Sequence, residues 1–140
     1  MQKKFYLDTS IWRDYFEDRS DGVRPLGEFA FQFLKNCAKK GFTILVSDTV
    51  ILELKKDFSE EQISDFFNPF ESIIVHIAAV SEQYAEAKKE WLQNKAIPLN
   101  DFLHAIIARD NNAILISRDR HFAELLSLVE SKLPEEVILD

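Results

Sequence analysis

Five short runs of apolar residues alternate along this chain with segments of helical periodicity. Each run is three to five residues long and almost entirely apolar. Such runs are typical of strands that are buried on both faces of a parallel sheet, with helices packed over those faces. The strands are expected at residues 5–7, 42–46, 73–77, 113–116 and 137–139. The pattern therefore predicts an α/β fold: a three-layer α/β/α sandwich with a central parallel sheet of four or five strands.

The segments between the runs carry recognisable helix signals. Residues 26–40 have apolar side chains at spacings of three and four, and Gly41 follows as the expected C-cap. Ser47 is placed to cap the helix after the second strand, and Ser59 with Gln62 forms a capping-box pattern. The other helices are expected over residues 9–18, 81–95, 101–109 and 121–131, the third of them capped by Asn100, and residues 19–25 form a polar loop.

Composition supports one folded domain over residues 1–140. Hydrophobic residues make up 46% of the chain, which excludes a disordered tail, and no linker-like stretch divides it. The 24 acidic residues exceed the 17 basic ones, which gives a formal net charge of −7. A protein that holds nucleic acid by bulk charge needs the opposite balance, so any contact with nucleic acid must be local.

Cys37 is the only cysteine, which excludes an intrachain disulfide and a cysteine-based zinc site. The N-terminal segment reaches Asp8 after three apolar residues, too soon for the apolar core of a signal peptide. No apolar run approaches the roughly 18 residues of a membrane span. We expect a soluble, cytoplasmic protein without a membrane partner.

Four carboxylates fall where this topology would bring them together. Asp8 closes the first predicted strand, and Asp119 comes three residues after the fourth. Glu53 lies in the helix after the second strand, and Asp101 opens the helix before the fourth. Strand ends and the following helix starts converge on one edge of an open α/β sheet, so all four are expected there. Because converging carboxylates repel one another unless a hard cation such as Mg²⁺ or Mn²⁺ neutralises them, we predict a metal site that acts on a phosphate-bearing substrate.

Taken singly, these carboxylates have plainer interpretations. A negative charge at Asp101 would stabilise a helix start, and Glu53 would be a solvated helix residue. Their joint context favours the metal site, because four short motifs surround them in a fixed order. The motifs are Tyr6-Leu-Asp8-Thr-Ser10, Ile51-Leu-Glu53-Leu, Asn100-Asp101-Phe-Leu-His-Ala-Ile-Ile-Ala108 and Ile116-Ser-Arg-Asp119-Arg-His-Phe122.

On these motifs the sequence resembles PIN-domain nucleases over essentially its whole length, and most closely the small VapC-type toxins of type II toxin–antitoxin systems. The resemblance implies a metal-dependent endoribonuclease that hydrolyses phosphodiester bonds in single-stranded or looped RNA. The implied catalytic and metal-binding residues are Asp8, Glu53, Asp101 and Asp119, which would hold one or two Mg²⁺ or Mn²⁺ ions. The resemblance also implies a homodimer and a small antitoxin protein that inhibits the site.

Several residues beside the four carboxylates enter the same hypothesis. The hydroxyls of Thr9 and Ser10 are expected near the first carboxylate, and Ser117 stands where the family commonly has Thr. His104 occupies a helix position where the family more often has a small apolar residue. His121 follows Asp119 by two residues and could contact phosphate, although a surface histidine at a helix start is the plainer interpretation.

Local positive charge is the expected contact with RNA. The candidate cations are Arg13, Lys55, Lys56, Arg118 and Arg120, and solvated surface charge is the alternative for each. Two other functions also stay open. One is a PIN-type nuclease that processes RNA without an antitoxin, and the other is a non-catalytic α/β module that binds a cation or a protein at the acidic edge. An aspartyl-phosphate enzyme is disfavoured, because Ser10 stands where that chemistry requires a second acid.

Overall fold

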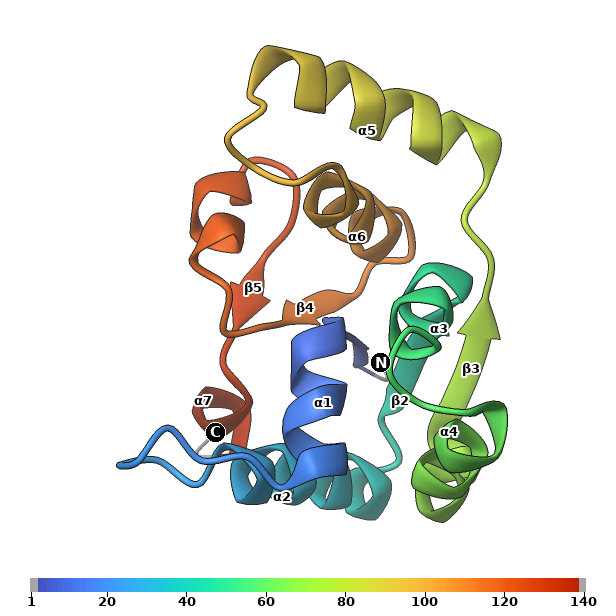
Figure 1. Ribbon diagram of the computed structural model, residues 1–140, viewed down its shortest axis with the longest axis vertical. Helices are drawn as coiled ribbons and strands as arrows, with labels where there is room; N and C mark the ends of the chain where they lie inside the picture. The colour runs from blue at the N-terminus through green and yellow to red at the C-terminus, as the bar shows by residue number, and fades with distance from the viewer. Residues whose placement is uncertain (1–2, 139–140) are drawn as a thin grey trace.

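The computed structural model describes residues 3–138, and a five-stranded sheet runs through its centre (Figure 1). The strands are β1 (Lys4–Leu7), β2 (Thr43–Ser47), β3 (Ile74–Ile77), β4 (Ile114–Ile116) and β5 (Ser131–Lys132). They lie in the order β3-β2-β1-β4-β5, and every neighbouring pair is parallel. The chain builds outward from β1 through β2 and β3, then returns to the other side of β1 with β4. The switch in strand order therefore lies between β1 and β4.

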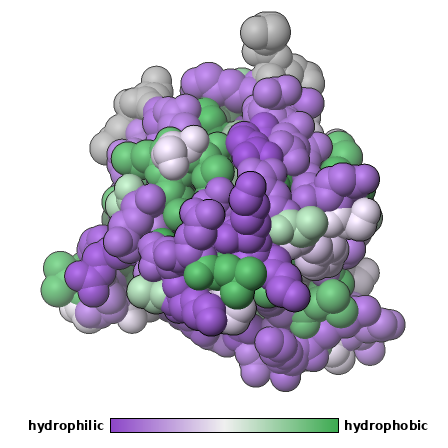
Figure 2. Space-filling view, turned by 90° about the horizontal axis from the view of Figure 1, so that it is seen from above, coloured by the Kyte–Doolittle hydropathy of each residue, from purple (hydrophilic) through white to green (hydrophobic). Residues whose placement is uncertain are grey.

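Helices cover both faces of this sheet, which confirms the predicted three-layer fold (Figure 1). They are α1 (Thr9–Glu17), α2 (Leu26–Lys40), α3 (Asp48–Leu54), α4 (Glu60–Phe67), α5 (Ser81–Gln93), α6 (Leu99–Asp110) and α7 (Pro134–Ile138), with short 3₁₀ segments at Asn68–Ile73 and Arg120–Leu125. On one side α2 packs against α1 and α7, and on the other α5 packs against α6. The surface seen from the α5 side is mostly hydrophilic, with separate hydrophobic patches (Figure 2).

Among residues 3–138, no helix is both long enough and apolar enough to cross a membrane.

The inner strands and α6 form the centre of the core. In β1, the side chains of Phe5, Tyr6 and Leu7 are each at most 1% exposed, because both faces of this strand are covered. In α6, every residue from position 102 to position 108 is buried. The site residues that these two elements carry are therefore held by a closely packed core.

The aromatic side chains of α1 belong to the core, as their amphipathic spacing predicts. The ring of Trp12 meets Phe67 of α4 edge-on, with 4.7 Å between ring centroids, and Phe16 stacks on Phe66 at 4.0 Å. These contacts fasten α1 to α4. Because Trp12 and Phe16 are buried, neither ring is available to stack on an RNA base.

Three of the predicted helix caps are present. Gly41 follows α2 in the left-handed conformation, with a φ of 71°. The hydroxyl of Ser47 accepts a backbone N–H of α3, and Ser59 and Gln62 make both bonds of a capping box at the start of α4. The prediction for Asn100 was wrong, because α6 begins at Leu99 and places Asn100 in its first turn.

The C-terminal part of the chain also differs from the prediction. The fifth strand is Ser131–Lys132, whereas the predicted strand at 137–139 falls in α7, apart from residue 139, which lies outside the described residues. Pro134 opens this helix, and Val137 is buried where α7 packs against α2. The apolar run thus marks the inner face of a helix. The helix predicted over residues 121–131 is likewise reduced to the 3₁₀ segment Arg120–Leu125.

Candidate active site

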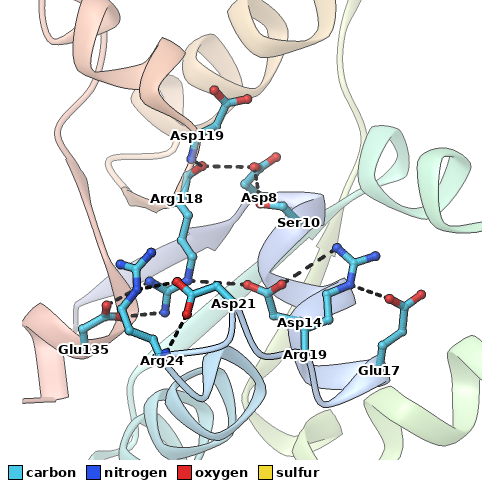
Figure 3. A network of polar contacts seen from close by, with 11 residues as sticks. Asp8, Ser10, Asp14, Glu17, Arg19, Asp21, Arg24, Arg118, Asp119 and Glu135 are labelled. Carbon is cyan, nitrogen blue, oxygen red and sulfur yellow. Dashed lines mark hydrogen bonds and ion pairs between the residues drawn. The ribbon is translucent and has the colours of Figure 1, made fainter.

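Asp8 lies at the carboxyl end of β1, where β1 and β4 end side by side. Its backbone N–H donates to the carbonyl of Ile116, the last residue of β4, at 2.9 Å. Its side chain is nearly buried, and the carboxylate Oδ2 accepts hydrogen bonds from the hydroxyls of Ser10 at 2.8 Å and Ser117 at 3.0 Å (Figure 3). Asp8 is thus a fixed carboxylate at the strand-order switch, the position where open α/β sheets bind ligands.

Ser117 connects the ends of β1 and β4. Its hydroxyl donates to Asp8 and accepts the backbone N–H of Asp119 at 3.0 Å. The side chain is buried, so both bonds are shielded from water. The sequence predicted a hydroxyl beside the site at this position, and the structure identifies the two acidic residues that it joins.

Asp101, Asp119 and His121 form a tight cluster near Asp8. The Nδ1 atom of His121 lies 2.8 Å from Oδ2 of Asp101 and 3.1 Å from Oδ1 of Asp119. In the part of the chain that the structure describes, these three residues each offer one ligand atom within 4.8 Å of the other two, as a metal ion requires. Burial raises the pKa of Asp101, and the charges of Asp119 and Asp8 raise it further against the hydrogen bond from His121. This edge therefore holds negative charge that a cation would neutralise.

Glu53 lies near the end of α3 and is held by donors from two other helices. Its Oε1 accepts the hydroxyl of Thr9 in α1 at 2.8 Å and Nε2 of His104 in α6 at 2.6 Å. Burial opposes ionisation of Glu53, but the hydrogen bonds from His104, Thr9 and Asn100 outweigh it and lower the pKa of this carboxyl. Glu53 is therefore an ionised carboxylate in a fixed orientation, outside the Asp101–Asp119–His121 cluster.

The donor set of this edge fits a divalent cation. Carboxylate oxygens are the ligands that Mg²⁺ and Mn²⁺ prefer, and a ring nitrogen such as that of His121 favours a first-row transition ion such as Mn²⁺ over Mg²⁺. Asp101, Asp119 and His121 are the residues that would hold the ion, and Asp8, like Glu53, lies outside this cluster, joined to Asp119 through Ser117. The sequence suggested His121 only as a phosphate contact. The feature that could have indicated a metal ligand is its position two residues after Asp119.

Arg118 does not face this site, although it lies between Ser117 and Asp119 in the sequence. Its side chain extends away from Asp8 (Figure 3). The guanidinium makes two hydrogen bonds to Glu135 of α7, at 2.6 and 2.8 Å, and lies 3.5 Å from the buried Asp14 of α1. Contrary to the prediction of an RNA contact, this arginine anchors the loop after β4 to α1 and α7.

The other predicted cations lie in different surroundings. Arg13 pairs with Asp57 and donates to the backbone carbonyl of Glu53 at 3.1 Å, so it supports the end of α3. Lys55 is exposed and lies 3.1 Å from Glu60. Lys56 and Arg120 are exposed, close in sequence to Glu53 and Asp119. Lys56 and Arg120 therefore stay candidate RNA contacts, whereas Lys55 pairs with Glu60 and Arg13 makes a structural contact.

A parallel sheet with ionisable side chains gathered at its strand-order switch defines a class: an α/β protein with its ligand site at the carboxyl edge of the sheet. Within this class, the chain can be assigned to one family. The family model of the PIN domain matches residues 5–126, and the chain belongs to the PIN-domain family. The matched segment contains Asp8, Glu53, Asp101 and Asp119. The resemblance drawn from the four motifs is thereby confirmed.

Two solved structures share the fold over nearly the whole chain. The crystal structure of VapBC2 from Rickettsia felis, bound to a DNA fragment from its promoter, matches with a TM-score of 0.65 and 25% identity, covering 91% of this chain and 98% of that chain. FitAcB from Neisseria gonorrhoeae matches with a TM-score of 0.62 and 14% identity, covering 94% of this chain and 98% of that chain, a likeness of fold alone. A comparison with curated protein sequences found no match.

Proposed function

We propose that this PIN-domain protein is a Mg²⁺- or Mn²⁺-dependent endoribonuclease that hydrolyses phosphodiester bonds in single-stranded or looped RNA. The observation that carries the proposal is the cluster of Asp101, Asp119 and His121 at the strand-order switch, to which Ser117 joins Asp8. The pKa of Asp101 is raised there by burial and by the neighbouring carboxylates. Membership of the PIN-domain family supports nuclease activity of this type.

Each acidic residue has a place in the proposed reaction. Asp101, Asp119 and His121 would hold the ion, and we place Asp8, which Ser117 joins to Asp119, in the same site. A bound divalent ion supplies charge neutralisation at the phosphate oxygens and makes water a better nucleophile. Glu53, ionised and fixed through Oε1, orients the attacking water or completes the site. The water oxygen would bond to phosphorus as the bond to the leaving ribose oxygen breaks, and the proton that the water gives up would end, directly or through solvent, on that leaving oxygen.

The RNA would be held by few contacts. Lys56 and Arg120 are exposed cations close in sequence to two of the site residues, whereas the protein as a whole carries a net charge of −7. Unstacked bases can be reached in single-stranded and looped RNA, whereas an RNA duplex hides their edges. We therefore expect RNA affinity to be weak without a metal ion and to fall further as salt is added.

The test is cleavage of mixed cellular RNA by the wild-type and Asp8→Asn proteins, each with and without Mn²⁺. The wild type should cut only with the ion. Asp8→Asn should lose more than about 100-fold in rate, since changes beyond the direct ligands already cost about 10- to 100-fold. Asp65→Asn, an exposed aspartate on α4, is the matched control and should cut normally. Equal rates for wild type and Asp8→Asn would refute the site, and no cleavage by the wild type would favour a non-catalytic cation-binding module.

A small antitoxin partner and a homodimer belong to the same proposal. The VapBC2 structure supports the partner, because this chain matches one chain of that assembly over 91% of its own length. A neighbouring reading frame that encodes a small DNA-binding protein, and growth arrest on expression, would favour a toxin in the cytoplasm over an RNA-processing nuclease. A strict monomer at high concentration in size-exclusion mass measurement would contradict the homodimer.

A further inference from the structure

A chain of buried hydrogen bonds runs from Glu53 through α6 into the sheet. Nε2 of His104 lies 2.6 Å from Oε1 of Glu53, and Nδ1 of the same ring lies 2.6 Å from the hydroxyl of Tyr6. The Tyr6 hydroxyl lies 2.6 Å from that of Ser47, which in turn accepts the backbone N–H of Val50 at 3.2 Å. His104, Tyr6 and Ser47 are each at most 1% exposed, so water does not compete for these bonds.

One direction of donation gives every proton in this chain an acceptor. Ser47 already accepts from Val50, so its own hydroxyl proton goes to Tyr6. In the neutral ring with its proton on Nε2, the Tyr6 hydroxyl then donates to Nδ1 of His104, and Nε2–H donates to Glu53. Nε2 carries a proton both in this neutral tautomer and in the imidazolium. Donation from Nε2 to Glu53 therefore does not depend on the charge of the ring.

This series of hydrogen bonds restricts the side-chain conformation of Glu53 more than helix α3 alone can. The carboxylate stands on a flexible side chain near the end of the seven-residue helix α3. Its Oε1 accepts from Thr9 and from His104, which come from helices on either side of it in the sequence, and neither of these two bonds uses Oε2. Donors on separate rigid elements hold a functional side chain in one geometry, and the buried ring of His104 is itself locked between two partners.

We propose that His104 is a positioning residue of this site: it fixes the orientation of Glu53 and connects it, through Tyr6 and Ser47, to the sheet. This inference rests on the proposed function, because orientation matters only if Glu53 serves a metal ion or its water. An apolar side chain at position 104 would leave Glu53 with one donor fewer and would leave the buried Tyr6 hydroxyl without its acceptor.

The first measurement is the affinity for Mn²⁺ in the absence of RNA, determined by electron paramagnetic resonance. His104→Leu should bind Mn²⁺ about 10-fold more weakly than wild type, the smaller of the losses found when support behind metal ligands is removed. His104→Gln keeps an amide donor near the position of Nε2 and should stay within about 3-fold of wild type. His76→Leu, on the exposed β3, is the matched control and should bind as wild type. Melting temperatures recorded beside each titration separate folded from unfolded variants.

The second measurement is a double-mutant cycle with Glu53→Gln. If His104 acts through Glu53, His104→Leu should cause no further loss of Mn²⁺ affinity or cleavage rate in the Glu53→Gln protein, whereas general damage would lower both again. The inference is overturned if His104→Leu both binds Mn²⁺ and cuts RNA as wild type, if His104→Gln loses as much as His104→Leu, or if the loss persists in the Glu53→Gln background. Normal Mn²⁺ binding and cleavage in His104→Leu would overturn this inference alone, whereas a wild type that neither binds Mn²⁺ nor cuts RNA would overturn the proposed function as well.

Discussion

Replacing Ser117 by Ala removes the one hydroxyl that joins Asp8 to the backbone of Asp119. A hydrogen bond to a charged acceptor contributes about 1.5–3 kcal/mol to stability, and one between neutral groups about 0.5–1.5 kcal/mol. Ser117 makes one bond of each kind, both at 3.0 Å, and is too deeply buried for water to replace them. We therefore expect Ser117→Ala to lower the free energy of unfolding of the metal-free protein by about 2–4 kcal/mol.

Urea denaturation measures this change, and Ser117→Thr is the matched control because it keeps the hydroxyl. The threonine variant should stay within about 1 kcal/mol of wild type, its added methyl group being the only new demand on the core. Mn²⁺ should also stabilise the alanine variant less than wild type. Of the two hydroxyls that hold Asp8, only that of Ser10 remains in this variant. A loss below about 0.5 kcal/mol in Ser117→Ala, or an equal loss in Ser117→Thr, would refute the reasoning.

Four further substitutions test the electrostatics of the molecule. Asp101→Asn removes a carboxylate whose pKa is raised by burial, so the variant without metal should be about 1 kcal/mol more stable than wild type. Mn²⁺ should no longer raise the melting temperature of this variant. A melting temperature below that of wild type, measured without metal, would contradict this. The hydrogen bond that His121 donates to Asp101 raises the pKa of this histidine, so the stability it contributes is complete below about pH 6.5 and is lost as the pH rises through the raised pKa. The difference between the wild-type and His121→Gln urea curves should shrink from pH 5 to 8, and a growing difference would reverse the sign. Arg118→Met leaves the buried Asp14 with only Arg19, whose guanidinium lies 3.9 Å away, and should cost up to about 3 kcal/mol of unfolding free energy, with RNA affinity by fluorescence anisotropy unchanged. Arg120→Ala should weaken RNA binding at unchanged stability, and weaker RNA binding by Arg118→Met alone would restore Arg118 as an RNA contact.

The fold was predictable where burial acts on both faces of an element. The inner strands β1, β2 and β4 each have an apolar run of three residues because helices cover both sides, and that pattern is visible in the sequence. β5 was missed because it consists of Ser131 and Lys132 at the edge of the sheet, where neither side chain needs to be apolar. Val137 resembled part of a strand because one buried helical turn presents the same short apolar run.

The carboxylates of the site were predictable from topology, since Asp8 and Asp119 follow neighbouring parallel strands. The directions of the side chains around them were not. Arg118 follows Ser117 directly, yet successive side chains in extended backbone point to opposite sides, and only the folded chain brings Glu135 within reach of the arginine. The contact between His104 and Tyr6 joins residues 98 positions apart, so no local pattern reveals it.

β4 pairs with β1 across more than a hundred residues of sequence, and this order of assembly determines when the site exists. A chain that ends before residue 114 contains Asp8 but lacks the carbonyl of Ile116, the hydroxyl of Ser117 and the carboxylate of Asp119. During synthesis the N-terminal part of a chain emerges first. A nascent or prematurely terminated copy of this protein that stops before β4 therefore carries no assembled acidic edge, and the site cannot form until the segment through Asp119 has been synthesised.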